Sequence, residues 1–126
     1  MEVLDSTALA KFLIANPDLA EECLPPHLMG AEVLSTTLCD VAYILFNLGF
    51  SRKKIADHLS NAIVSFEVED QTLLLLATTM FARSFFTFPE CIEYVYCLLD
   101  DREPHFENEC LQRSFDTGEF FGDLKK

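Results

Sequence analysis

Four acidic residues of this chain each stand where an extended or apolar run gives way to a helix-like stretch: Asp5, Asp40, Glu90 and Glu109. In an open α/β sheet the chain passes from strand to helix at the carboxyl edge of the sheet, so acids at such passages can converge in one crevice. Carboxylate oxygens are the ligands that hard divalent cations prefer. The recurrence therefore predicts an oxygen-lined cation site on an α/β fold.

Extended and helical patterns alternate along the sequence. Short β-branched or alternating runs predict strands at 2–4, 32–36, 63–68 and 118–121, with a short extended piece at 105–106. Apolar residues at helical spacing predict helices after residue 5 and over 17–23, 37–49, 52–60, 71–84, 88–99 and 109–115. Because most connections are two to six residues long, we expect one domain over residues 1–126, a three-layer α/β/α sandwich with a central, mainly parallel sheet.

Several expected helix starts carry a capping side chain. Ser51, Asp70 and Asn108 each precede a helical pattern, and Thr87 to Glu90 has the T-x-x-E form of a capping box. Thr37 to Asp40 resembles the same box with Asp in place of Glu. Taken singly, each of the acids is better explained as a cap than as a metal ligand. Their number and placement favour the metal site, because carboxylates that lie close together repel unless a cation holds them.

Composition narrows the class of protein. Half of the 126 residues are apolar and twelve are Phe, so the chain can bury a real core. No apolar run approaches the length of a membrane span, and Glu2 and Asp5 precede any apolar stretch, which is the wrong polarity for a secretory signal. Five cysteines without a CxxC pair and three distant histidines predict reduced thiols and no zinc site. We expect a soluble, cytoplasmic protein.

The chain is strongly acidic. A net charge of −12 predicts weak non-specific binding to nucleic acid, although bound cations or a basic partner chain would change the local field. The main basic cluster is Arg52-Lys53-Lys54, which stands against the dipole at the start of its helix. The Phe-rich segment 85–88 is either a stacking platform for single-stranded RNA or a packing surface, in the core or in a dimer, and its apolar flanks favour packing.

The order of these motifs resembles the PIN domain family across essentially the whole chain. Val3-Leu4-Asp5-Ser6-Thr7 looks like the family's first strand with its Asp, and 35–43 matches the place of a Glu early in an apolar helix. Phe88-Pro89-Glu90-Cys91-Ile92 resembles its Asp-Ala-x-Ile segment, and 106–109 stands where the family shows Thr-x-Asp. The resemblance implies a metal-dependent endoribonuclease, often the toxin of a toxin–antitoxin pair.

On this resemblance, Mg²⁺ or Mn²⁺ activates water and stabilises charge on the scissile phosphate of an RNA substrate. Asp5 and Glu90 would hold the metal most directly, and Asp40 and Glu109 would complete the shell. Ser6 or Thr7 would orient a carboxylate or a bound water. The implied partners are an antitoxin protein and, from the apolar helices, a second copy of the chain in a homodimer.

The sequence departs from the family at three of the four acids. Asp40 stands for Glu, Glu90 and Glu109 stand for Asp, and Glu107 replaces the usual Thr. Each change moves a carboxylate by one methylene, which the strict octahedral shell of Mg²⁺ tolerates poorly. The alternative is therefore a domain that has lost its chemistry and serves as a protein-interaction module. A cysteine nucleophile (Cys39 or Cys91 with His105) and a receiver-like phosphoacceptor have weaker support in the spacing.

Overall fold

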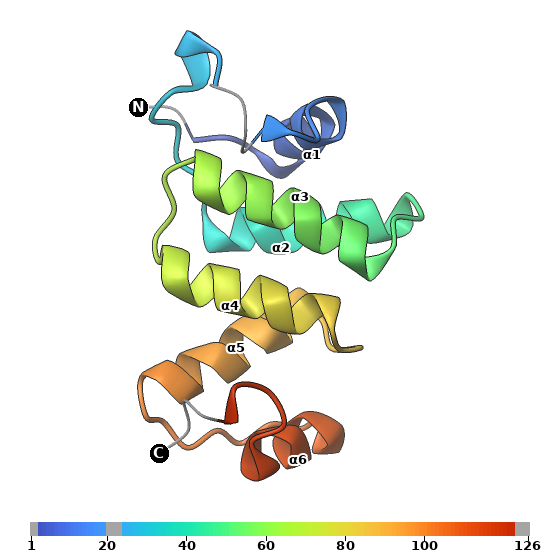
Figure 1. Ribbon diagram of the computed structural model, residues 1–126, viewed down its shortest axis with the longest axis vertical. Helices are drawn as coiled ribbons and strands as arrows, with labels where there is room; N and C mark the ends of the chain where they lie inside the picture. Colours follow the sequence, from blue (N-terminus) through green and yellow to red (C-terminus); the bar gives the residue numbers. More distant parts are fainter. Residues whose placement is uncertain (1–2, 20–23, 123–126) are drawn as a thin grey trace.

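Helices make up nearly all of the regular structure. The computed structural model describes residues 3–19 and 24–122. Six α-helices and one short 3₁₀ helix are found in these residues (Figure 1): α1 Ser6–Ala15, η2 Pro26–Leu28, α2 Ser35–Asn47, α3 Arg52–Ser65, α4 Gln71–Ala82, α5 Phe88–Leu99 and α6 Glu109–Thr117. The helices after Asp5, Ser51, Asp70, Thr87 and Asn108 begin where the sequence predicts them.

The predicted α/β/α sandwich is wrong, because the described residues contain no β-sheet. Three of the four predicted strands fall on single bridging residues or on helix instead. Val3 pairs with Glu32, and Glu32 pairs with Glu67, both in parallel. The fourth, 118–121, is a turn after α6. The described chain is therefore all-helical, with a narrow parallel contact between three connecting segments.

Helices occupy part of the segments that were predicted to be strands. Asp5 already caps α1, and α2 begins at Ser35 within the predicted second strand. The segment 63–68 alternates apolar and polar residues, but Leu59, Ile63 and Phe66 also continue a buried helical face, and α3 runs on to Ser65. Helical periodicity thus prevails over the alternation, because it extends an apolar stripe that is already packed.

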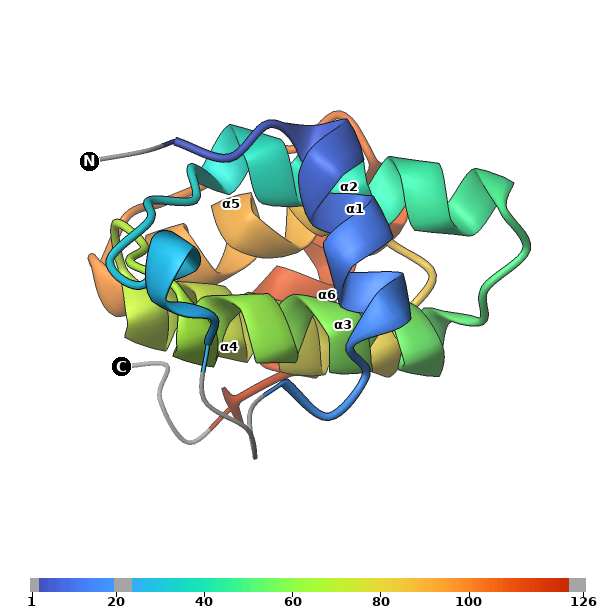
Figure 2. The same cartoon turned by 90° about the horizontal axis from the view of Figure 1, so that it is seen from above.

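The helices are stacked along the long axis of the molecule. In Figure 1, α1 lies at one end, α2 and α3 follow, then α4 and α5, with α6 at the other end. Figure 2 shows α1 lying across α2 and α3, and both of these helices contact it. The most extensive helix contacts are those of α4 with α5 and with α3. The centre of the stack is therefore the layer α3–α4–α5.

One hydrophobic core joins these helices. Its largest fully buried side chains come from every α-helix: Leu9, Leu13, Leu38, Leu45, Ile55, Leu59, Ile63, Leu74, Met80, Phe88, Tyr94 and Leu111. Burying one such side chain contributes about 1.5–3 kcal/mol. Edge-to-face ring contacts, such as Phe81 with Phe88 at 5.9 Å between centroids, add to this packing.

The start of α2 differs from the sequence prediction. The capping box expected at Thr37 to Asp40 is not formed, because the helix begins two residues earlier and Thr37 is buried inside it. The carboxylate of Glu69, from the α3–α4 connection, accepts hydrogen bonds from the backbone N–H of Ser35 at 3.2 Å and from its hydroxyl at 3.3 Å. A side chain distant in sequence thus supplies the cap.

Three smaller predictions have mixed outcomes. The predicted helix over 17–23 lies partly outside the described residues. Cys39, Cys91, Cys97 and Cys110 are free thiols, as expected, although Cys110 is exposed. Within residues 3–19 and 24–122, no helix has both the length and the apolar character needed to cross a membrane.

Tyr94 ties the C-terminal part of the chain to α5. Its hydroxyl is buried and lies 3.1 Å from the carbonyl oxygen of Ser114 and 3.3 Å from that of Phe120. Its ring contacts Phe115 and Phe120 edge to face, with centroids 5.2 and 6.0 Å away. The backbone N–H of Phe120 also donates to this hydroxyl, at 3.4 Å. The Ser114 carbonyl has further donors in the N–H groups of Gly118 and Glu119, so the hydroxyl serves mainly the backbone of Phe120.

We predict that Tyr94→Phe lowers the free energy of unfolding by about 1–2 kcal/mol, because it removes the hydroxyl that pairs with the N–H and the carbonyl oxygen of the buried Phe120. Urea unfolding followed by circular dichroism would measure the change. Tyr43→Phe is the matched control, since Tyr43 is 69% exposed and should change stability by less than about 0.5 kcal/mol. Equal losses in the two variants would show that the buried hydroxyl has no special role.

Candidate functional site

An open aromatic groove lies between α2, the first turn of α3 and the α4–α5 connection. Its volume is 560 Å³, and its lining residues are Cys39, Asp40, Ala42, Tyr43, Phe46, Arg52, Phe81, Phe85, Thr87, Phe88 and Pro89. We call this surface the aromatic groove. It combines three neighbouring elements and is more apolar than polar, as binding clefts usually are.

Three aromatic side chains of the groove are largely exposed to solvent, although aromatic side chains usually pack in the core of a folded protein. Tyr43 is 69% exposed, Phe46 is 60% exposed and Phe85 is 96% exposed. Tyr43 and Phe46 are three residues apart and so share one face of α2, while Phe85 stands on the connection between α4 and α5. A cluster of exposed aromatic rings beside a hollow typically marks an interaction site.

The second apolar face of α2 explains how this surface arises. Leu38, Val41 and Leu45 are fully buried against the rest of the protein. The remaining apolar side chains of α2 must point elsewhere, and Tyr43 and Phe46 are left facing solvent. Nearly two faces of α2 are apolar in sequence, a pattern that by itself favours a well-buried helix. In the structure only one of these faces is covered.

Arg52 fixes one wall of the groove. Its guanidinium donates hydrogen bonds to the carbonyl oxygens of Phe81, at 2.9 Å, and of Phe86, and its carbon lies 3.9 Å from the centroid of the Phe81 ring. These contacts hold the end of α4 and the following connection against the start of α3. The charge of Arg52 is thereby engaged with backbone carbonyls and an aromatic face, and is poorly available to an anionic partner.

Apart from Arg52, Asp40 is the one charged side chain among the described residues that line the groove. Its carboxylate and that of Glu93, which does not line the groove, both act on the Cys39 thiol. Burial, together with these two negative charges, raises the pKa of Cys39 to about 11. Arg52 is the one basic side chain among the described residues that line the groove. The groove therefore offers apolar rings beside negative charge.

The two cysteines considered as nucleophiles are protonated at neutral pH. Burial raises the pKa of Cys91 to about 12, only partly offset by its hydrogen bond with Ser84, and the pKa of Cys39 is also high. A nucleophilic cysteine reacts as the thiolate, which a raised pKa suppresses. These environments do not favour cysteine catalysis.

The four acids predicted as metal ligands occupy different helix positions. Asp5 is the N-cap of α1, and its Oδ1 accepts a hydrogen bond from the backbone N–H of Ala8 at 2.8 Å. Asp40 lies in the second turn of α2, on its exposed side. Glu90 stands in the first turn of α5, and Glu109 is the first residue of α6.

The structure brings Glu90 to the start of α6 through a side-chain contact. Oε1 of Glu90 accepts hydrogen bonds from the backbone N–H of Thr87 at 2.9 Å and from its hydroxyl at 3.1 Å, which completes the predicted capping box. Oε2 accepts a hydrogen bond from the Asn108 side-chain amide at 3.1 Å. Asn108 in turn caps α6, whose first residue is Glu109. Both carboxylate oxygens of Glu90 thus have hydrogen-bond donors.

Asp5, Ser6 and Thr7 are not gathered with this pair. Helices α1 and α6 lie at opposite ends of the stack in Figure 1, so Asp5, with Ser6 and Thr7 beside it, is remote from Glu109 and from Glu107 just before α6. In the described part of the chain, no three His, Cys, Asp or Glu side chains form a group able to hold a metal ion. The convergence expected at the edge of a sheet depended on a sheet, which the described chain does not contain.

We predict that Asp5→Ala lowers the free energy of unfolding by about 1 kcal/mol, because it removes the cap of α1. Asp40→Ala is the control: Asp40 lies beyond the first turn, so this change should cost less than about 0.5 kcal/mol. Thermal unfolding without metal would compare them. A rise in melting temperature for Asp5→Ala would instead indicate repulsion within a carboxylate cluster, as the metal-site hypothesis expects.

Comparisons with known proteins do not assign this chain to a family. No protein-family model, no curated protein and no solved structure matches it. What this chain can do is therefore argued from its own side chains.

Proposed function

We propose that this chain is a protein-interaction module whose aromatic groove binds a basic, amphipathic helix of another protein. This was the alternative to catalysis in the sequence, where three altered acids and the charge of −12 motivated it. The single observation that carries the proposal is the exposure of three aromatic rings, Tyr43, Phe46 and Phe85, around one groove.

Aromatic exposure of this kind is costly unless a partner covers it. Burying one Phe side chain contributes about 1.5–3 kcal/mol, so leaving Phe85 almost wholly in water forfeits that gain. Rings of this type, clustered at the centre of a protein–protein contact, commonly supply most of its binding energy. The groove is also pre-formed, because Arg52 holds its wall to α4 and the connection that carries Phe85.

The net negative charge of the molecule favours binding of a basic partner over self-association. Each copy carries −12, so two copies repel each other, while a basic segment is attracted. Asp40 places a negative charge in the lining of the groove, and the cation of Arg52 is already engaged. An amphipathic helix with apolar residues at i, i+3, i+4 and i+7 and basic residues on its flanks would match both features.

We predict that a synthetic amphipathic helix of about 18 residues, with Leu along one face and Lys on its flanks, binds the chain with saturable heat in isothermal titration. Phe85→Ala should weaken this binding roughly tenfold or more, because a central aromatic contact is worth about 1.4–2 kcal/mol or more. Phe46→Ala should act in the same direction.

Val64→Ala provides the matched control for these variants. Val64 is 47% exposed on α3 and does not line the groove, so its removal should leave the affinity unchanged. A peptide of the same composition, scrambled to remove its apolar face, should bind weakly. If Val64→Ala weakened binding as much as Phe85→Ala, or if the scrambled peptide bound equally well, the groove would not be the docking site.

The dependence on salt distinguishes this partner from the predicted homodimer. Added salt screens attraction between opposite charges and repulsion between like charges. Binding of the basic helix should therefore weaken at high salt, whereas self-association of an acidic chain should strengthen. The antitoxin protein implied by the family resemblance stays a prediction, and a basic amphipathic segment is the feature by which this groove would bind one.

A metal-dependent ribonuclease is the second candidate function, and one contact favours it. The bond between Glu90 and Asn108 joins the starts of α5 and α6, which carry two of the four acids of the sequence hypothesis. A divalent cation such as Mg²⁺ or Mn²⁺ would then bind near Glu90 and Glu109, in competition with the hydrogen bonds that both carboxylate oxygens of Glu90 accept.

On this second candidate, we predict that Mn²⁺ binds the wild-type chain in isothermal titration, supports cleavage of single-stranded RNA, and fails to do either with Glu90→Gln. Glu103→Gln is the control, because Glu103 is an exposed acid on the α5–α6 connection. Absence of Mn²⁺ heat in the wild type, or equal cleavage by the two variants, would remove this candidate and leave the interaction module untouched.

A further inference from the structure

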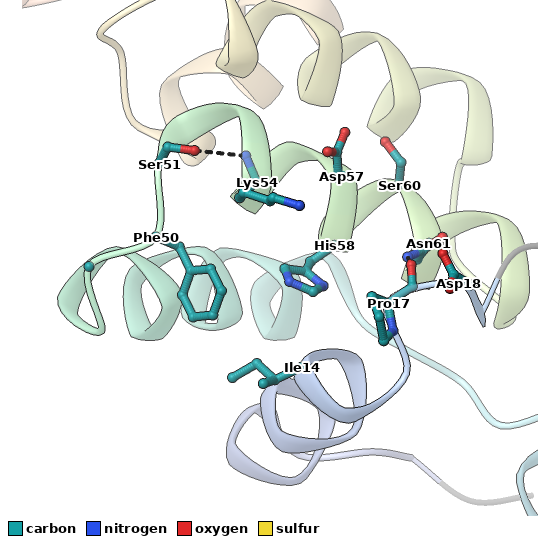
Figure 3. Close-up of a pocket in the computed structure, with 11 residues that line it drawn as sticks. Ile14, Pro17, Asp18, Phe50, Ser51, Lys54, Asp57, His58, Ser60 and Asn61 are labelled. Atoms are coloured by element: carbon teal, nitrogen blue, oxygen red, sulfur yellow. Dashed lines mark hydrogen bonds between the residues drawn. The ribbon is translucent and has the colours of Figure 1, made fainter.

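A second hollow lies on the α1 side of α3, apart from the aromatic groove. It has a volume of 780 Å³ and is bounded by the end of α1, the turn between α2 and α3, and the first half of α3. Figure 3 shows the side chains that line it, with Lys54 and His58 extending from α3 and Phe50 beside them. We call it the α1–α3 pocket.

His58 is the buried polar group of this pocket. The residue is only 7% exposed, and its Nδ1 has no hydrogen-bond partner among the described residues. Its ring lies edge to face with Phe50, at 5.5 Å between centroids. A buried nitrogen without a partner is costly, and a ligand toward which the ring turns would supply a partner and recover that cost.

The start of α3 supplies positive potential next to His58. Ser51 caps the helix by accepting a hydrogen bond from the backbone N–H of Lys54, and Arg52, Lys53 and Lys54 occupy the first turn without an acid among them. Basic side chains at a helix N-terminus are unfavourable, because the dipole there is already positive. In a chain of net charge −12, this first turn is an unusual concentration of positive charge.

Of these three cations, Lys54 belongs to the α1–α3 pocket. Arg52 is bound to the carbonyls on the aromatic-groove side, and Lys53 does not line the pocket. Lys54 and His58 are four residues apart, so their side chains lie on the same face of α3. Within the described residues Lys54 has no carboxylate within 4 Å, since the one salt bridge found there joins Arg102 to Asp100.

The remaining lining gives the pocket an apolar wall and an acidic far end. Ile14 and Phe50 form the apolar side of the pocket, while Pro17 stands on the other side of the His58 ring from Phe50 in Figure 3. Asp18 stands with Pro17 at the far end, and Asp57 points away from Phe50 and Ile14 in Figure 3. An anionic group is therefore favoured at the Lys54 end and disfavoured at the Asp18 end.

We propose that the α1–α3 pocket binds a small aromatic anion, with its phosphate or carboxylate group between Lys54 and His58 and its ring against Phe50 and Ile14. The anion accepts a hydrogen bond from His58 and pairs with Lys54, and its charge relieves the unfavourable electrostatics at the start of α3. This site is separate from the docking surface proposed above and does not depend on it.

The charge state of His58 gives the site a direct readout. Burial, and then the neighbouring Lys54, lower the pKa of His58, while Asp57 acts in the opposite direction. An anion bound beside the ring favours its charged form and should raise that pKa. The chain has only three histidines, so the His58 signal can be assigned with single substitutions.

Titration with phenyl phosphate, followed by NMR of the His58 ring, tests the proposal. We expect a saturable shift of the His58 signal and a higher His58 pKa in the bound state. Benzoate in a second titration shows whether a carboxylate serves as well as a phosphate. Inorganic phosphate and phenol, which carry only the anion or only the ring, should each bind more weakly than phenyl phosphate.

Lys54→Gln and Lys53→Gln form a matched pair for this experiment, because they remove the same charge from adjacent positions of one helix turn. Lys54→Gln should weaken phenyl phosphate binding roughly tenfold, as expected for one charge-assisted contact, and Lys53→Gln should change it less than about twofold. Equal losses in both variants, an unmoved His58 signal, or phenol binding as tightly as phenyl phosphate would overturn the proposal.

Discussion

The fold depends on satisfying the free N–H groups at the start of each helix. Four backbone N–H groups are unpaired at every helix N-terminus, and a stack of short helices multiplies them. In the described chain every α-helix has a side-chain oxygen there, from Asp5, Glu69, Ser51, Asp70, Thr87 and Asn108 in the order α1 to α6. These caps determine where the helices begin, and they engage two of the acids that the sequence suggested for a metal.

The helices could be predicted from the sequence because two independent signals agree in them. A capping residue and a following apolar stripe coincide at Ser51, Asp70, Thr87 and Asn108. The strands had one weak signal, and 63–68 fits a helical face as well as an alternation. Two parallel bridges, of Val3 with Glu32 and of Glu32 with Glu67, lie where the parallel sheet was expected. No local pattern shows that these three short segments will be joined by single-residue bridges and not by strands.

The candidate site was harder to predict, because exposure is a property of the packed molecule. The acids can be identified in the sequence, but whether they converge depends on the topology of the chain, and the predicted topology was wrong. The aromatic groove had a signal in the two apolar faces of α2 and in the Phe-rich segment 85–88. Packing divides these residues: Phe88 is 1% exposed and Phe85 is 96% exposed. Three Phe residues within one four-residue segment cannot be told apart by periodicity.

The first turn of α3 stands between the two surfaces proposed to bind ligands. Arg52 reaches the α4–α5 connection and so positions the groove that carries Phe85, whereas Lys54 lines the α1–α3 pocket. If both proposals hold, an anion at Lys54 adds negative charge near the groove and strengthens its attraction for a basic helix. Because coupling between binding sites is reciprocal, the basic helix must strengthen anion binding by the same factor. The sign of this coupling follows from charge alone, and so it should diminish as salt screens the field between the two sites.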